Sequence, residues 1–151
     1  MDFTTRGFSR ILVAVDGSES SMDAADYAID IAKMYNAQLT TLTVSHISKS
    51  SYGLAGLPDS IKQTKEKHAL ESKQWFDNLN QRAKQNDVQL KTELIDSQMS
   101  VDGTIAEYAE SHDIDLIILG TRGRSGFKKL LLGSVASGVV NYATCPVMVV
   151  K

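Results

Sequence analysis

The sequence predicts an α/β protein with one doubly wound, mainly parallel sheet of five strands, in the order 3-2-1-4-5, and helices on both faces. Short apolar runs without polar alternation recur along the chain, and strands that are covered on both faces have this pattern. Amphipathic helical patterns separate the runs, as right-handed crossover connections require. The length of 151 residues is typical of one domain, and no internal repeat is visible. We therefore expect residues 1–151 to form a single domain.

The strands are predicted from runs of Val, Ile and Leu. Four of these runs are continuous and indicate buried strands at Ile11–Val15, Leu39–Val44, Leu116–Leu119 and Val147–Val150. The segment Val88–Leu94 alternates between apolar and polar residues instead. This alternation favours a strand with one face in water, as at a sheet edge.

Four helices are expected between the strands. Ser18 is the predicted N-cap of the first helix, which is expected to end near Asn36. Pro58 and Asp59 open a long polar helix after an aperiodic segment, Ile47–Pro58, and the last helix begins at Ser134. The residues expected to face inward are, helix by helix, Met22, Ala25, Ile29 and Ala32; Trp75, Phe76, Leu79 and Ala83; Ile105, Tyr108 and Ala109; and Val135, Val139 and Tyr142.

The composition indicates which binding partners and which cellular compartment to expect. A formal net charge of −2 gives no reason to expect nucleic acid or an anionic membrane as a partner. The apolar run at Ile11–Val15 is too short for a signal peptide or a membrane span. Cys145 is the only cysteine, so we expect no intramolecular disulfide, a small buried apolar role for this residue, and a reducing, cytoplasmic setting.

A glycine-rich segment follows the fourth predicted strand. Gly120, Gly123, Gly133 and Ser134 form a Gly-x2-Gly-x9-Gly-Ser arrangement that runs from a strand end to a helix start. Glycines let backbone N–H groups approach an anion closely, and Ser134 adds a hydroxyl at the positive end of a helix dipole. This pattern is typical of a nucleotide-phosphate site. The alternative is a glycine-rich loop that serves only as a turn.

The same segment is strongly basic. No acidic residue occurs from Gly120 to Ser134, whereas four cations do: Arg122, Arg124, Lys128 and Lys129. Charge-assisted hydrogen bonds from such groups suit phosphate, although a solvated basic face has the same composition.

An acidic residue follows the first predicted strand. In a doubly wound sheet, ligands bind outside the carboxyl ends of the strands at the switch point, which here lies between the first and fourth strands. Asp16 comes directly after Val15 at this place, where its carboxylate can accept a hydrogen bond from a ribose hydroxyl or an adenine amino group. The alternative is an Asp that only shapes the turn before Gly17.

Taken together, these motifs resemble the universal stress protein family, in its ATP-binding branch. The resemblance rests on Val15-Asp16-Gly17-Ser18, the glycine spacing above and the ending Thr144-Cys145-Pro146-Val147, and it covers nearly the whole chain. It implies a Rossmann-like fold and a dimer formed through the last strand, Val147–Val150. Asp102-Gly103 departs from the family pattern, in which a glycine followed by small residues opens the third helix.

The resemblance also implies a ligand and its contacts. The ligand is ATP, or alternatively ADP, AMP or a cyclic adenine nucleotide, with Mg²⁺ as the accompanying ion. Asp16 and the backbone of Val44 would hold the adenosine. Together with these two, the predicted nucleotide-binding set contains Ala14, Val15, Leu119, Gly120, Arg122, Gly123, Arg124, Gly133, Ser134 and Val135.

Three functions remain open at this point. The first is an ATP-binding regulatory module of the stress response that acts as a dimer on an unknown client protein. The second is a slow ATPase or phosphotransferase, for which no clear catalytic base is present. The third is an interaction dimer that needs no nucleotide. The chain has no Walker motif or nucleophile elbow, and its three histidines, His46, His68 and His112, have no metal-ligand spacing.

Overall fold

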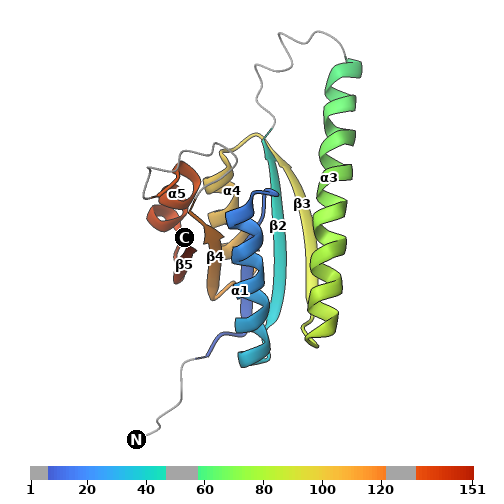
Figure 1. Ribbon diagram of the computed structural model, residues 1–151. Coiled ribbons are helices and arrows are strands. Elements are labelled where there is room, and N and C mark those ends of the chain that lie inside the picture. The colour runs from blue at the N-terminus through green and yellow to red at the C-terminus, as the bar shows by residue number, and fades with distance from the viewer. Residues whose placement is uncertain (1–6, 47–57, 122–131) are drawn as a thin grey trace, which may run out of the picture.

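The computed structural model describes residues 7–46, 58–121 and 132–151. Five parallel strands form one sheet in the order β3-β2-β1-β4-β5, which confirms the predicted fold class (Figure 1). The strands are β1 (Arg10–Ala14), β2 (Gln38–His46), β3 (Leu90–Ser97), β4 (Leu116–Gly120) and β5 (Val147–Val150). Most of the aperiodic segment expected after the second strand lies outside the described residues.

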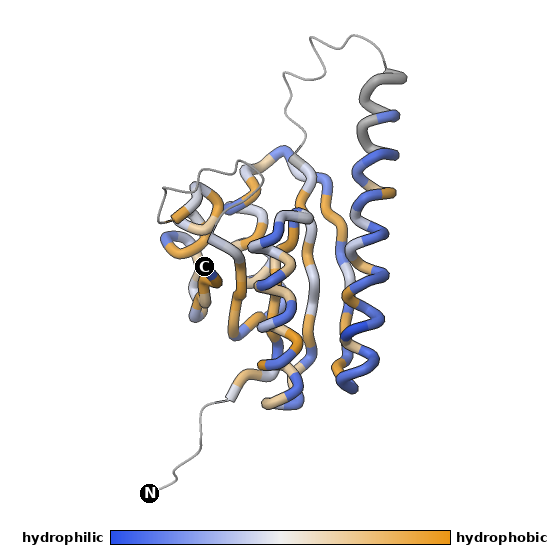
Figure 2. The backbone as a smooth tube through the Cα atoms, viewed as in Figure 1, coloured by the Kyte–Doolittle hydropathy of each residue, from blue (hydrophilic) through white to orange (hydrophobic). Residues whose placement is uncertain are grey.

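Within the described residues, four helices cover the two faces of the sheet. They are α1 (Glu19–Tyr35), α3 (Pro58–Gln85), α4 (Val101–Ser111) and α5 (Ser134–Tyr142). Side chains of α1 and α3 share one apolar core with the sheet, and side chains of α4 and α5 share a second core on the opposite face. Figure 2 shows that α3 is polar along most of its length. None of the helices in the described residues carries an apolar stretch that would cross a membrane.

Local signals in the sequence fix where α1 begins and ends. The Ser18 hydroxyl accepts a hydrogen bond from the backbone N–H of Ser21 at 3.3 Å, so Ser18 is the N-cap, as predicted. Asn36 adopts a left-handed conformation with φ 53° and ends the helix, also as predicted.

The same helix ending recurs before β3 and β4. Asp87 (φ 55°) and Asp113 (φ 54°) take the left-handed position that Asn36 takes in α1. In each case the next residue donates a backbone hydrogen bond of 2.9 Å to a carbonyl in the last turn of the helix, for example from Val88 to Ala83. This bond ties Val88 to the end of α3. As a result β3 begins at Leu90, two residues later than the alternation of the sequence predicts.

Most of the residues predicted to face inward do so, Tyr142 does not, and Trp75 does so only in part. Tyr142 is 66% exposed, because the inward stripe of α5 runs through Ala136, Val139 and Ala143, and Tyr142 lies on its flank. Trp75 is half-buried, yet it is not among the described side chains that pack against the apolar core beneath α3, whereas Phe76 is. The expectation of an inward-facing residue was therefore wrong for Tyr142 and holds only in part for Trp75.

Two further expectations concern single residues. Cys145 is half-buried beside the second core rather than fully buried, and desolvation by burial raises the pKa of its thiol above the usual value. Asp102 lies in the first turn of α4, against Gly138 of α5. A Cβ at Gly138 would collide with the Asp102 carboxylate, so this glycine permits the close approach of the two helices.

Two threonines on one face of β2 offer a matched test of core polarity. Both hydroxyls lie beneath α1 and α3, because alternate residues of a strand share a face with Leu39. The Thr43 hydroxyl donates a 3.0 Å hydrogen bond to the carbonyl of Val15, whereas the fully buried Thr41 hydroxyl has no partner among the described residues. We predict that Thr41→Val raises the free energy of unfolding by about 1 kcal/mol and that Thr43→Val lowers it by a similar amount.

Urea unfolding followed by circular dichroism measures both variants. Equal changes in the two variants would contradict the assignment of one satisfied and one unsatisfied hydroxyl.

Candidate functional site

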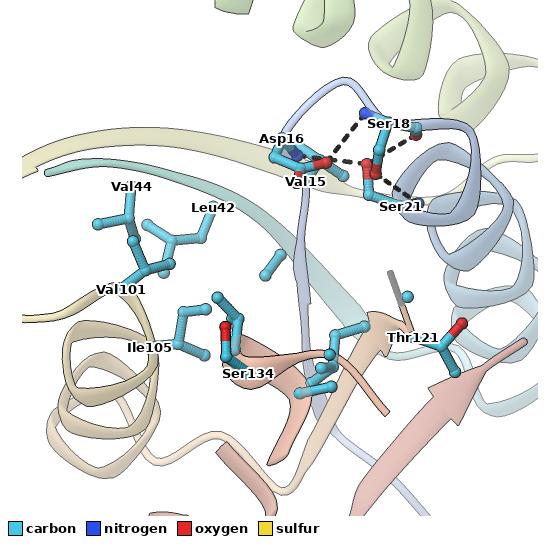
Figure 3. A pocket seen from close by; sticks show the side chains of 16 residues that line it. Val15, Asp16, Ser18, Ser21, Leu42, Val44, Val101, Ile105, Thr121 and Ser134 are labelled. Carbon is cyan, nitrogen blue, oxygen red and sulfur yellow. Dashed lines mark hydrogen bonds between the residues drawn. The ribbon is translucent and has the colours of Figure 1, made fainter. Parts of the chain in front are cut away.

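A cavity of about 300 Å³ lies at the carboxyl ends of β1 and β4 (Figure 3). Its position is the switch point of the sheet, because the chain pairs β1 with β2 on one side and with β4 on the other. The volume is at the lower end of the range for small-molecule sites. The lining residues are Ala14, Val15, Asp16, Ser18, Ser21, Leu42, Val44, Val101, Ile105, Leu119, Gly120, Thr121, Gly133, Ser134, Val135 and Ala136.

One side of the cavity is the hydrogen-bonded turn between β1 and α1. The Asp16 carboxylate accepts a 2.9 Å hydrogen bond from the backbone N–H of Ser18. The Ser21 hydroxyl donates to the Ser18 carbonyl at 2.9 Å and accepts from the Asp16 backbone N–H at 3.3 Å. These bonds, drawn as dashed lines in Figure 3, hold an anionic acceptor at the edge of the cavity.

The opposite side of the cavity is apolar. Leu42 and Val44 come from β2, where alternate residues share a face, and Val101 and Ile105 come from one face of α4. Figure 3 shows these four side chains gathered together, away from the Asp16–Ser21 turn. This wall suits a flat apolar group that must be removed from water.

The first turn of α5 forms a third boundary. Ser18 caps α1 and Ser100 caps α4, but Gly133, the N-cap of α5, makes no side-chain capping bond. Because the N-cap residue is a glycine, it offers no side-chain acceptor to the backbone N–H groups that open α5, which also have no intrahelical acceptor. Such a helix end, with Ser134 at its first position, is suited to an anion.

The glycine at position 120 has a packing role in addition to its place in the cavity lining. A Cβ there would lie 2.7 Å from the backbone carbonyl of Ser20, so Gly120 lets the first turn of α1 approach the end of β4. Gly133 has φ −66°, which any residue can adopt, and its N–H donates to the Thr121 carbonyl at 2.7 Å. Close packing thus explains Gly120, whereas backbone conformation does not require a glycine at position 133.

The structure brings together every predicted site residue that it describes. Asp16 and Ser134 lie on the rim, and the lining also includes Ala14, Val15, Val44, Leu119, Gly120, Gly133 and Val135. The predictions for Arg122, Gly123 and Arg124 fall outside the described residues.

The sequence reasoning missed several lining residues. Leu42 precedes Val44 by two positions on β2, and Val101 precedes Ile105 by one helical turn, so both spacings carried a signal. Ser18 was predicted as a cap, although not as part of the site. Nothing local to the sequence indicated Ser21, Thr121 or Ala136.

Comparison with known proteins gives a consistent family. The model described as "Universal stress protein family" matches residues 7–151. Universal stress protein MJ0531 of Methanocaldococcus jannaschii is 34% identical over 146 residues, which cover 95% of this chain and 82% of that protein. The structure of universal stress protein UspA from Lactobacillus plantarum superposes with a TM-score of 0.83 at 28% identity, covering 97% of this chain and 100% of that one.

Some similar structures contain adenine nucleotides. A universal stress protein in complex with cAMP has a TM-score of 0.68 at 23% identity, and covers 97% of this chain and 98% of that chain. The Archaeoglobus fulgidus protein in complex with dAMP has a TM-score of 0.72 at 19% identity, with coverages of 95% and 98%. An Arabidopsis thaliana family protein with AMP bound has a TM-score of 0.66 at 15% identity, with coverages of 95% and 91%. At these sequence identities, the structural similarity shows only that the fold is shared.

We predict that Gly120→Ala destabilises the protein even when no ligand is present. The added methyl group would meet the Ser20 backbone, which cannot turn aside as a flexible side chain can. The expected loss is about 1–3 kcal/mol of unfolding free energy, measured by urea titration of the ligand-free protein. An unchanged midpoint would contradict the packing role of this glycine.

Proposed function

The chain belongs to the universal stress protein family, and from this premise we propose that it is an adenine-nucleotide-binding regulatory module of the stress response. One observation carries the proposal. The cavity at the switch point combines an apolar wall, a carboxylate acceptor and an uncapped helix N-terminus, which match the base, the nucleoside hydroxyls or amino group, and the phosphate of such a ligand.

In this proposal, each part of the cavity contacts a different part of the nucleotide. The base lies against Leu42, Val44, Val101 and Ile105, and Asp16 accepts a hydrogen bond from the nucleoside. The nearest phosphate receives N–H groups from the first turn of α5 and the hydroxyl of Ser134.

We further propose ATP as the ligand, with Mg²⁺ on its phosphates, and ADP or AMP as weaker occupants of the same cavity. The support is the basic sequence Arg122-Gly123-Arg124, which lies outside the described residues and whose cations suit additional phosphates. Mg²⁺ usually binds through phosphate oxygens and water, and so needs few protein ligands.

No specific observation favours the catalytic alternative. Asp16 is the only ionisable side chain among the described residues that line the cavity, and its carboxylate already accepts the Ser18 N–H. Phosphoryl transfer needs a group that positions the nucleophile, and no second candidate lies beside Asp16 in the described part of the lining.

A homodimer through β5 is part of the proposal. β5 ends the strand order of the sheet, and Val147, Met148 and Val149 are only half-buried. α5, which contacts β5, exposes 47% of Val140 and 66% of Tyr142. A second copy that pairs with this edge would cover both the outer edge of β5 and the adjacent apolar side chains.

The setting and partner of this module are proposed on sequence and family grounds. A cytoplasmic location fits a chain whose single cysteine, Cys145, does not need an oxidising compartment. We also propose that the module has a client protein as a partner.

Titration calorimetry of the purified protein with ATP, AMP and adenosine, with and without Mg²⁺, tests the nucleotide proposal. Gly133→Val places a side chain where the phosphate would lie, so we expect AMP and ATP to bind at least tenfold more weakly, with a smaller effect on adenosine. Ser111→Ala is the control, because it removes a 2.9 Å hydrogen bond to the Glu107 carbonyl in the last turn of α4 and Ser111 does not line this cavity. This variant should lose stability while keeping its nucleotide affinity. Wild-type protein that binds neither AMP nor ATP would refute the function.

Sedimentation equilibrium tests the dimer. We expect the wild-type protein to be dimeric and a Val140→Glu/Tyr142→Glu variant to dissociate, because both side chains are exposed in the single chain and the charges would be buried in the dimer. Leu70→Glu, at a 63% exposed position on α3, should remain dimeric. A dimer that persists in the double variant would exclude this edge as the interface.

A further inference from the structure

The only tryptophan of the chain occupies an unusual position in α3. Its neighbour Phe76 packs against the apolar core, and further along the helix Leu79 and Ala83 are buried in it. Trp75 instead lies over Gly17, in the turn between β1 and α1. The indole therefore joins the long polar helix to the turn that carries Asp16.

Gly17 is restricted by this contact and by its own backbone. Its φ of 81° lies in the left-handed region that favours glycine. A Cβ at this position would also lie 2.9 Å from Cη2 of Trp75, and closer still to Cζ2 and Cε2. The outer ring of the indole thus occupies the space that any side chain at Gly17 would need.

The turn is held between the indole and the cavity. In Figure 3 the labelled Asp16 and Ser18 lie between the cavity and the green ribbon of α3. Gly17 separates these two residues, and the 2.9 Å hydrogen bond from Ser18 N–H to the Asp16 carboxylate closes the turn around it. A displacement of Gly17 toward α3 would therefore move the Asp16 carboxylate relative to the apolar wall.

We propose that Trp75 is a positioning residue for the cavity: its outer ring holds the Asp16–Ser18 turn in the conformation that binds ligand, and so connects α3 to the nucleotide. This inference rests on the proposed function, since the ligand is the nucleotide assigned there. Because coupling between two sites is reciprocal, a ligand that orders the turn also stabilises the contact between Trp75 and Gly17. α3 is then the element through which occupancy of the cavity reaches the surface of the protein.

A pair of neighbouring variants separates positioning from stability. Trp75→Ala removes the ring over Gly17, and Phe76→Ala removes an aromatic ring of the same helix that packs against the apolar core. We expect both variants to lower the melting temperature, but only Trp75→Ala to weaken AMP binding, by roughly tenfold, as expected when a hydrogen bond to a charged group is lost. Trp75→Phe, which keeps a ring but lacks the outer ring of the indole, provides an intermediate value should Trp75→Ala fail to fold.

A double-mutant cycle with Asp16→Asn identifies the route of the effect. The Asn side chain keeps an oxygen for the Ser18 N–H but loses the charge. If Trp75 acts through Asp16, Trp75→Ala should cost much less AMP affinity in the Asp16→Asn background than in the wild-type background. Equal losses in the two backgrounds would overturn the positioning role.

Hydrogen exchange of the Ser18 amide gives a readout that does not involve ligand. Exchange should be faster in Trp75→Ala than in Phe76→Ala at matched global stability, and AMP should slow exchange around position 75 of α3 in the wild-type protein. If the wild-type protein binds AMP but Trp75→Ala binds it equally well, only the positioning role is overturned. If the wild-type protein binds no AMP, the proposed function fails and the positioning role fails with it.

Discussion

The chain leaves β1 and β4 toward opposite faces of the sheet, and the cavity exists because of this divergence. After β1 the chain enters α1 on one face of the sheet, and α5, the next helix described after β4, lies on the other face. The same divergence brings the turn at Asp16 and the first turn of α5 to one opening. The apolar wall follows from β2 and α4, which line the opening on the second face.

Close contacts at three glycines near the cavity fix the positions of the helices around it. Gly120 lets α1 reach the end of β4, Gly138 lets α5 reach Asp102 on α4, and Gly17 fits under Trp75 of α3. In each case the missing side chain of the glycine leaves room for an atom of a residue that is distant in the sequence. A glycine in such a motif can permit close packing or can leave room for a ligand. The sequence alone does not distinguish these two roles, whereas the contacts in the structure identify the glycines that permit packing.

Much of this organisation could be predicted from the sequence, because the signals are local. Apolar runs identified the strands, Ser18 and Asn36 marked the ends of α1, and the switch-point rule predicted from strand order where the cavity lies. The errors arose where distant contacts decide. Val88 reads as strand but is held by the end of α3, Tyr142 has inward spacing but lies on the flank of α5, and the contact between Trp75 and Gly17 joins elements 58 positions apart.

Amide chemical shifts of labelled protein test the central claim most directly, because they report on the opening of α5 residue by residue. On addition of AMP, the N–H resonances of Ser134, Val135 and Ala136 should shift strongly, and on addition of adenosine they should shift far less, since only AMP carries the anion that these groups would bind. Leu42 and Val44, on the apolar wall, should respond to both ligands. Shifts from AMP that avoid the first turn of α5, or that match those from adenosine there, would contradict the account.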